Sequence, residues 1–313
     1  CSFIVSCISH SFSFALQNLI GAVTLLVQPD LRCYSHCESR WSGAIHLWST
    51  PTELRGAALT SLEKVVDQRR WWKEILFILG FYLVYARIRN QFGSNGLFAA
   101  DTTTAADNAR TVINLEKKIG LFFEEQLQSF FIDWGWFLWF WNVFYGSLHF
   151  VVTIGTGIFL FRKFPARFLR YRTGLAITTA LGLVGFAAFP LMPPRLLSTP
   201  PPYGGSMTEF AFVDTLAVHG GLWSFDSGTL QAISNQWAAM PSLHLAWAAW
   251  CALALIPVLN SRWARLTMWS YPIATSFGIV VTANHYWIDG LAGLVVLILG
   301  MECAKLISRI RFR

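Results

Sequence analysis

Apolar runs that are long enough to cross a lipid bilayer recur along the chain from residue 72 onward. A hydrocarbon core of about 30 Å requires roughly 17 to 25 mostly apolar residues in a helix. Six runs meet that length, at about residues 72–89, 134–161, 173–191, 241–260, 266–282 and 286–307. The pattern therefore predicts an all-α fold, a polytopic membrane helix bundle with six spans.

Three other segments interrupt this series of apolar runs. Residues 1–70 are apolar only in patches, so a degraded signal segment, an extra span and a loosely packed leader all stay open. Over about 108–131, apolar side chains recur at helical spacing between charged ones, which predicts a helix on the membrane surface or on the protein's own outer face. A Pro- and Gly-rich stretch, about 193–236, predicts an outer loop. The chain thus divides into a leader of uncertain structure, 1–70, and a six-span membrane domain, 71–313.

The composition excludes an ordinary soluble domain and an intrinsically disordered chain. Hydrophobic residues make up 54% of the positions and charged residues only 13%, as is typical of a membrane protein. The six cysteines give no disulfide framework, because two lie in apolar spans and the others lie at Cys37 or earlier. Cys33, His36 and Cys37 lack a second ligand pair at a suitable spacing, so no zinc site is predicted.

The formal net charge of +7 follows the positive-inside rule only in part, because six basic residues fall outside the pattern: Arg87, Arg89, Arg110, Lys117, Lys118 and Arg195. Five basic residues and no acid occupy 162–172, between the second and third spans. Arg262 and Arg265 lie between the fourth and fifth spans, and four basic residues occur from Lys305 onward. With six crossings, all these clusters fall on one side of the membrane. That side is predicted to be cytoplasmic, and no nucleic-acid partner is expected.

The opposite, outer side then receives three polar stretches, at residues 193–195, 241–244 and 282–289. The fourth and fifth spans form a hairpin with a short turn, because only a few residues separate them. His244 and His285 therefore return to the same membrane level although they are far apart in the sequence. The candidate chemistry of the protein is predicted to lie where these stretches meet.

His285 and Asp289 are four positions apart and so share one face of a helix. The carboxylate can accept a hydrogen bond from one ring nitrogen, which leaves the lone pair of the other free to attack. Ionisable groups near membrane depth are costly, so each is a functional candidate. In the competing interpretation, both histidines are hydrated interfacial residues, and Asp289 only occupies a first helical turn, where the helix dipole favours an acid.

Two of the polar stretches match known signatures. Residues 241–244 (Pro-Ser-Leu-His) and 284–289 (Asn-His-Tyr-Trp-Ile-Asp) resemble the second and third motifs of the type 2 phosphatidic acid phosphatase superfamily. Within it, they look like the inositol phosphorylceramide synthase-like (inositolphosphotransferase) branch, over about residues 134–307. The resemblance implies a six-span phosphatidic acid phosphatase type 2-like core. It also implies that His285 attacks phosphorus to form a phosphohistidine, that Asp289 orients His285, and that His244 protonates the departing alkoxide.

Groups other than His244, His285 and Asp289 must hold the phosphate of the substrate. The outward N-termini of the fourth and sixth spans offer N–H groups, and Pro-Pro-Arg at 193–195 resembles the first motif of this branch. The candidates for phosphate or substrate binding are Arg195, Ser242, Asn284, Tyr286, Asn142, Tyr145 and His149. Two alternatives stay open: Arg195 as a headgroup-anchoring side chain, and the Asn142, Tyr145 and His149 stripe as a buried polar helix contact.

Two positions depart from the phosphatase form of the motifs. Leu243 stands where the phosphatases have Gly, and Ile279 where they have an Arg six residues before the motif histidine. Loss of that Arg removes a bidentate phosphate clamp. The departures favour the phosphotransferase-like branch over the plain phosphatases.

These features together predict a multi-pass integral membrane enzyme whose active site faces the extracytoplasmic side. It acts on a membrane lipid phosphate, and transfer to a polyol or lipid hydroxyl acceptor is slightly favoured over release of phosphate to water. A non-catalytic lipid-binding or transport protein on the same spans is the alternative of another class. No cofactor is expected, and no metal ion either, because no Asp/Glu cluster suited to Mg²⁺ lies near the histidine pair.

Overall fold

The structure is a computed structural model that describes residues 71–91, 101–221 and 235–311. Over these residues the fold is all-helical, as predicted, and the only β-type pairing is an isolated bridge between Leu191 and Ala238. The predicted leader, with its cysteines, lies outside the described residues. Contacts divide the chain into two compact units, and every residue of the candidate site lies in the second, Tyr85–Lys305.

Each of the six predicted apolar runs is a helix. In chain order they are α4 (Trp71–Gln91), α7 (Gly135–Val143) continuing through the π-helical turn η2 (Phe144–Leu148) into α8 (His149–Lys163), α9 (Pro165–Ala188), α12 (Leu243–Leu255) with the 3₁₀ turn η4 (Ile256–Val258), α13 (Arg262–Val281) and α14 (Trp287–Arg311). By length and composition, two described segments can cross a membrane, Gly135–Lys163 and Trp287–Ile310. The apolar segment Leu243–Val258 is shorter.

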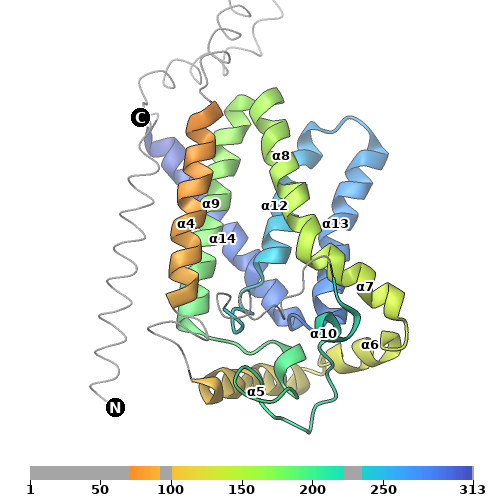
Figure 1. Cartoon of the computed structure of the whole chain (residues 1–313). Helices are drawn as coiled ribbons and strands as arrows, with labels where there is room; N and C mark the ends of the chain where they lie inside the picture. The colour runs from red at the N-terminus through yellow and green to blue at the C-terminus, as the bar shows by residue number, and fades with distance from the viewer. Residues whose placement is uncertain (1–70, 92–100, 222–234, 312–313) are drawn as a thin grey trace, which may run out of the picture. The chain divides into compact units, whose positions relative to one another are not determined.

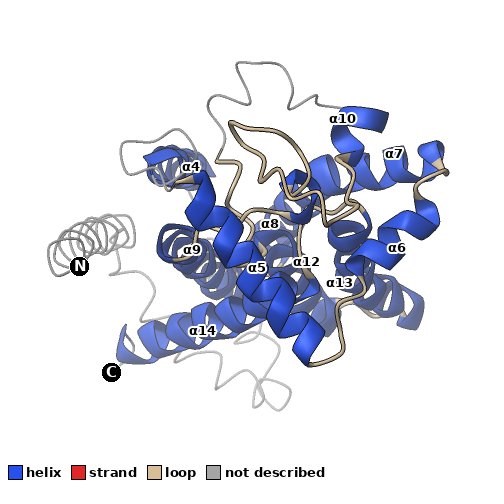
Figure 2. Cartoon of the chain, turned by 90° about the horizontal axis from the view of Figure 1, so that it is seen from below, coloured by secondary structure: helices blue, strands red, loops and turns tan. Residues whose placement is uncertain are grey.

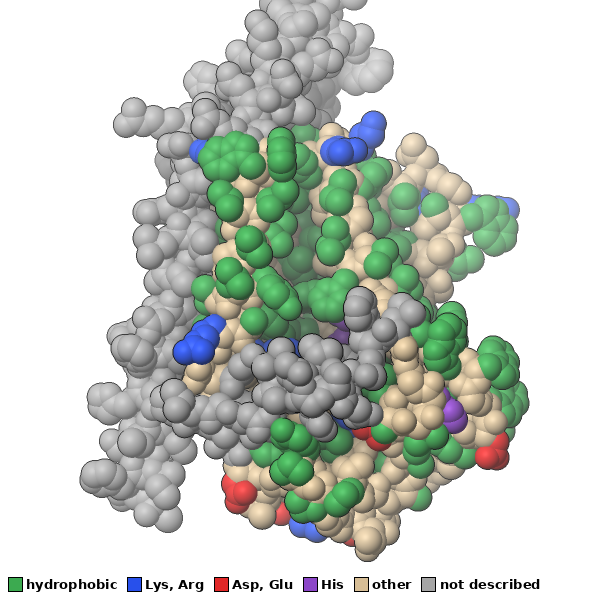
Figure 3. Space-filling model, viewed as in Figure 1, with side chains coloured by type: hydrophobic (Ala, Val, Ile, Leu, Met, Phe, Trp, Pro, Cys, Tyr) green, Lys and Arg blue, Asp and Glu red, His purple; other side chains and the backbone are tan. Residues whose placement is uncertain are grey.

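Helix α12 is the central element of the second unit. It packs against α8, α9 and α13, and two views show it between them (Figures 1 and 2). Most apolar side chains of α12 are buried, including Leu245, Ala248 and Trp250, as expected of a helix that is enclosed over most of its surface. The surrounding helices expose apolar side chains instead, such as Ile154 of α8 and Ile298 of α14. Figure 3 shows such hydrophobic surface along the helices.

A second layer closes one end of the bundle. It contains α5 (Thr102–Lys118), α6 (Glu124–Phe131), the 3₁₀ turn η3 (Pro194–Leu196) and α10 (Thr215–His219). Its buried core is formed by one face of α5 and by apolar side chains of the segments that follow α9 and precede α12. The acidic side chains visible in Figure 3 lie toward this end. Exposed Arg and Lys mark the end of α8 and the start of α13, at the opposite end.

The segment predicted as one helix at about 108–131 forms two helices. Helix α5 ends at Lys118 because Gly120 adopts a φ of +73°, a left-handed conformation that glycine accommodates without strain. The apolar face of α5, including Ala109, Val112 and Ile113, packs into the core of the second layer.

Close backbone contacts join the second layer to the bundle. The Leu191 N–H donates to the Trp237 carbonyl at 2.9 Å, and the Arg195 N–H donates to the Ala283 carbonyl at 2.8 Å. Helix α14 approaches the chain before α12 so closely that a Cβ built on Gly293 would lie 2.2 Å from the Ser242 carbonyl oxygen. The absence of a side chain at Gly293 therefore sets the spacing between α14 and the start of α12.

We expect Gly293→Ala to destabilise the protein by about 1–3 kcal/mol, because the added methyl group must displace backbone rather than a flexible side chain. The gain in helix propensity is smaller, up to about 1 kcal/mol. The matched control is Gly157→Ala in α8, where a Cβ would meet no atom within 4 Å. Thermal unfolding of both purified variants in detergent measures the difference. Equal melting temperatures for the two variants would contradict this account of the helix spacing.

Candidate active site

The three polar stretches of the sequence meet at the junction between the bundle and the second layer. The Ser242 N–H donates to the Asp289 carbonyl at 2.8 Å, which ties the start of α12 to the first turn of α14. The turn between α13 and α14 is tied to η3 through Ala283 and Arg195. Ala283 is fully buried and has a φ of +52°. Such strain in a non-glycine residue persists only where the surrounding structure imposes it.

His285 and Asp289 form a buried pair. Nδ1 of His285 lies 3.3 Å from Oδ2 of Asp289, and that oxygen also accepts the Tyr286 N–H at 3.0 Å. His285 is 3% exposed and Asp289 is fully buried. Nε2 of His285 is buried and has no hydrogen-bond partner among the described residues. With the proton on Nδ1 facing the carboxylate, Nε2 carries a free lone pair.

The ring of His244 lies beside this pair. It projects from the first turn of α12, and its centroid is 5.7 Å from that of His285. Tyr145 stacks on His244 at 4.0 Å and His149 approaches it at 4.3 Å. Nδ1 of His149 is 2.8 Å from the Tyr145 carbonyl. Tyr145 lies in η2, where the π-helical turn locally widens the helix. Its ring packs on His244 from this turn.

Asn142, on the same predicted stripe, has a different environment. Its Nδ2 donates to the carbonyls of Thr215 and Gly220, both at 2.9 Å, and its Oδ1 accepts the Thr215 hydroxyl at 2.9 Å. These contacts hold both ends of α10 against α7. The stripe is therefore divided, with Tyr145 and His149 beside His244 and Asn142 beside α10.

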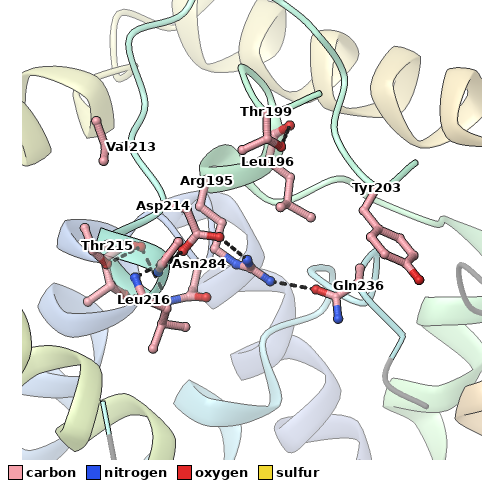
Figure 4. A network of polar contacts seen from close by, with 12 residues as sticks. Arg195, Leu196, Thr199, Tyr203, Val213, Asp214, Thr215, Leu216, Gln236 and Asn284 are labelled. Carbon is pink, nitrogen blue, oxygen red and sulfur yellow. Dashed lines mark hydrogen bonds and ion pairs between the residues drawn. The ribbon is translucent and has the colours of Figure 1, made fainter. Parts of the chain in front are cut away.

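Arg195 is held between two side chains of the second layer. One guanidinium nitrogen donates to Asp214 at 2.6 Å and the other to Gln236 at 2.9 Å (Figure 4). Asp214 is fixed in turn, because it accepts the Leu216 and Ala217 N–H groups as the N-cap of α10. Nε of Arg195 is buried without a partner in the described part of the chain. The side chain is only 13% exposed, which does not fit an anchor reaching for lipid headgroups.

The residues that flank the two histidines differ in whether their polar side-chain atoms form hydrogen bonds within the protein. The Ser242 hydroxyl is buried, and no described residue bonds to it. Nδ2 of Asn284 donates to the Thr282 hydroxyl at 2.8 Å, within its own turn. The Tyr286 hydroxyl donates to the Met192 carbonyl at 3.2 Å, and its ring lies in the core of the second layer. Of these candidates, Ser242 alone keeps a hydroxyl uncommitted to the described residues.

Two carboxyl groups close to the site were missed by the sequence reasoning. Glu116 of α5 and Glu124 of α6 are fully buried and accept N–H groups from the first turn of α14. Burial, and then the neighbouring Glu124, raise the pKa of Glu116 to about 9. A sequence signal existed, because Glu116 continues the apolar spacing of Ala109, Val112 and Ile113. No comparable signal marks Glu124.

Arg89 of α4 was missed as well. Its guanidinium donates to the Asn235 carbonyl at 3.4 Å, and its own carbonyl accepts from the Asn235 amide at 3.4 Å. Its positive charge acts electrostatically on both Tyr145 and His244. In the sequence it is only the second of two arginines at the end of an apolar run.

The arrangement can perform nucleophilic substitution. A buried imidazole with a free Nε2 lone pair and a carboxylate behind it can attack an electrophilic atom. A second imidazole beside it can exchange a proton with a leaving or entering oxygen. Buried donors without partners, Arg195 Nε and Ser242 Oγ, would be satisfied by an anion.

Comparison with known proteins gives one match. A family model described as the PAP2 superfamily matches residues 110–302, which is more than half of the chain and includes both histidines, Asp289 and Arg195. Searches of curated proteins and of solved structures give no match.

Proposed function

The chain belongs to the PAP2 superfamily, and from this premise we propose that it is an integral membrane enzyme that cleaves a lipid phosphoester through a phosphohistidine on His285. Membership of the superfamily supports a phosphatase-type enzyme of lipid metabolism. One observation carries the finer proposal. The buried, unpartnered Nε2 of His285 has Asp289 behind it and the His244 ring 5.7 Å away.

The proposed reaction has two steps. In the first, Nε2 of His285 forms a bond to phosphorus while the bond from phosphorus to the ester oxygen breaks, and His244 gives its proton to that oxygen. Asp289 stabilises the positive charge that develops on the ring of His285. In the second step, His244 takes the proton of a water or alcohol whose oxygen attacks phosphorus. The bond from phosphorus to nitrogen then breaks, and both histidines return to their starting state.

We assign phosphate binding to Arg195, Ser242 and the N-terminal N–H groups of α12. Arg195 Nε and Ser242 Oγ are buried donors without partners in the described chain, and a helix N-terminus favours an anion. Asp214 and Gln236 support this role, because they fix the orientation of the guanidinium.

The other candidates are assigned supporting roles. The hydrogen bonds of Asn142, Asn284 and Tyr286 are made to neighbouring backbone and side chains, so we propose that these residues shape the site rather than bind phosphate. Tyr145 and His149 lie against the ring of His244 and would hold it in position.

We further propose that all six helices cross the membrane and that the site faces the extracytoplasmic side. The support is the difference in charge between the two ends of the bundle. Arg162, Lys163, Arg262 and Arg265 are exposed at one end. The other end exposes both signs, with the carboxylates of Asp107 and Glu209 beside Arg110 and with Lys117 and Lys118 on α5. Positive charge unaccompanied by acids is typical of the cytoplasmic side of membranes, which assigns the end with the second layer and the site to the opposite side.

Sidedness is tested by introducing single cysteines into a variant without native cysteines. Thr208→Cys lies in the second layer and Lys163→Cys at the end of α8, and both positions are exposed. We expect a membrane-impermeant thiol reagent to label Thr208→Cys in intact cells and Lys163→Cys only after the cells are opened. The reverse pattern would put the site on the cytoplasmic side.

The histidine chemistry is tested by alkali-quenched trapping of labelled phosphate on the purified protein, because the phosphorus–nitrogen bond of a phosphohistidine is labile in acid. We expect His285→Ala to lose the label and at least about a thousandfold of turnover, because the nucleophile is removed. Asp289→Asn should keep a residue of activity, with a loss on the order of a hundred- to ten-thousandfold, because the amide no longer stabilises the charged ring. His219→Ala, in α10, is the control and should label normally. An active wild-type enzyme that never carries label would contradict the phosphohistidine.

For the acceptor, we propose transfer to a hydroxyl compound, as in the inositolphosphotransferase-like branch. At the position where the phosphatases have Arg, this chain has Ile279, whose side chain is buried in an apolar cluster with Leu245 and Val280. An apolar side chain packed in the core thus takes the place of the guanidinium, so fewer positive charges hold the phosphate. We propose that the acceptor is selected by the described part of the outer loop, about residues 193–221, because it lies next to the site and outside the histidines.

The acceptor is identified by giving the purified protein a labelled phospholipid with and without a panel of alcohols that includes inositol. We expect a new phosphate ester of at least one alcohol, detected by mass spectrometry, which is a phosphodiester when the donor lipid is itself a phosphodiester. The product of transfer to water should fall to match. Free phosphate or phosphomonoester as the only product, unchanged by every alcohol, would instead indicate a lipid phosphatase. Ile279→Leu, which preserves the apolar packing, is the control and should not alter the product ratio.

A further inference from the structure

Carboxyl groups from two different helices bind the start of α14. Oε1 of Glu124 accepts the Trp287 N–H at 3.1 Å, and Oε1 of Glu116 accepts the Ile288 N–H at 3.4 Å. A third carboxylate, Asp289, accepts the Tyr286 N–H at 3.0 Å. The three residues are fully buried. The positively polarised N-terminus of α14 is thus enclosed by acids from α5, α6 and α14 itself.

The two glutamates are part of a rigid connection. Oε2 of Glu124 also accepts the N–H of Phe123 at 2.9 Å, which fixes the carboxylate at the start of its own helix. The Trp287 indole donates to the Leu121 carbonyl at 2.8 Å, from the chain between α5 and α6. The first residues of α14 are therefore held from outside the bundle by the second layer.

Three buried carboxyl groups at one helix terminus cannot all be charged without a large cost. Glu116 has a pKa raised to about 9 by burial and by Glu124, with Asp289 adding to the rise, so it is protonated at neutral pH. Glu124 of α6 and Asp289 of α14 are the titratable groups that bear on it. Oε2 of Glu116 receives no hydrogen bond from the described residues. Since Oε1 accepts the Ile288 N–H, we assign the proton to Oε2.

We propose that Glu116 and Glu124 are positioning residues for the reaction, which fix the first turn of α14 and thereby the geometry of Asp289 and His285. The proposal rests on the function proposed above for that pair. The reason is that only a few hydrogen bonds separate the two glutamates from Asp289 and His285. Oδ2 of Asp289 is bonded both to the Tyr286 N–H and to the His285 ring, and the next two N–H groups along the chain are bonded by Glu124 and Glu116.

The two glutamates have different tasks in this arrangement. Glu124 uses both carboxyl oxygens as acceptors, one for the Trp287 N–H and one for the Phe123 N–H. Glu116 accepts the Ile288 N–H as a neutral acid. Glutamine has nearly the shape of a neutral glutamic acid and keeps both a donor and an acceptor. Glu116→Gln should therefore preserve the arrangement, whereas Glu124→Gln would turn an NH₂ group toward the N–H of either Trp287 or Phe123.

The experiment measures kcat and KM from pH 6 to 10 for wild type, Glu116→Gln, Glu116→Ala, Glu124→Gln and the control Glu125→Gln. Glu125 neighbours Glu124 in α6, but its carboxylate accepts the Ala211 N–H instead. We expect wild type to lose kcat as the pH rises through about 9, because ionised Glu116 then repels Glu124 and Asp289. Glu116→Gln should stay within about twofold of wild type at pH 7 and keep its activity above pH 9.

Glu116→Ala and Glu124→Gln should each lower kcat about tenfold or more with little change in KM, since substrate contacts remain in place. Glu125→Gln should follow wild type throughout. The proposal is overturned if Glu116→Gln shows the wild-type alkaline loss, or if Glu116→Ala keeps its kcat. A merely structural role for Glu116 predicts reduced folded yield with an unchanged pH profile, which also counts against it.

A readout without turnover separates this proposal from the proposed reaction. The ring signals of His285 can be followed by NMR in protein with labelled histidines, assigned by their loss in His285→Ala. Glu116→Ala and Glu124→Gln should shift them, and Glu125→Gln should not. If the variants shift the signals but the wild-type protein neither turns over nor carries labelled phosphate, the positioning role is supported and the proposed reaction is refuted. Unshifted signals would refute the positioning whatever the activity.

Discussion

The buried start of α14 is the constraint on which the arrangement of the site depends. A helix N-terminus presents several N–H groups without intrahelical partners, and away from water each must find an acceptor. Here the acceptors are the side chains of Glu116, Glu124 and Asp289. Because these acceptors come from three different helices, satisfying one helix terminus also fixes α5 and α6 on the bundle.

The same requirement explains the second layer. Its segments lack regular structure over long stretches, so their polar groups are satisfied by side chains. Asn142 holds both ends of α10, and Gln128 of α6 both donates to and accepts from the backbone of Val213, each at 2.9 Å. Asp214 caps α10 and binds Arg195 at the same time. Orientation of the guanidinium is thus tied to the fold of the layer through Asp214.

The histidine cluster shows how the bundle contributes chemistry. Three imidazoles and one phenol lie ring against ring, with His244 at the centre. Aromatic packing fixes the His244 ring, whose nitrogens form no hydrogen bond with the described residues. The His285 ring is fixed by a carboxylate. The two histidines are therefore held by different forces, which suits one to exchange protons and the other to attack.

The sequence by itself determined the helices, the polar stretches between them and the pairing of His285 with Asp289. These follow from local rules, since apolar run length sets a helix and a spacing of four places two side chains on one face. The sequence also identified Arg195 as a single cation in a long outer loop, but it did not identify Asp214 and Gln236 as its partners. Tertiary structure alone decided that Asn142 faces α10 while Tyr145 faces His244. It also decided that α5 and α6 carry acids to the start of α14, because those contacts join residues more than 160 positions apart, and no local pattern encodes which distant N–H group a carboxylate will meet.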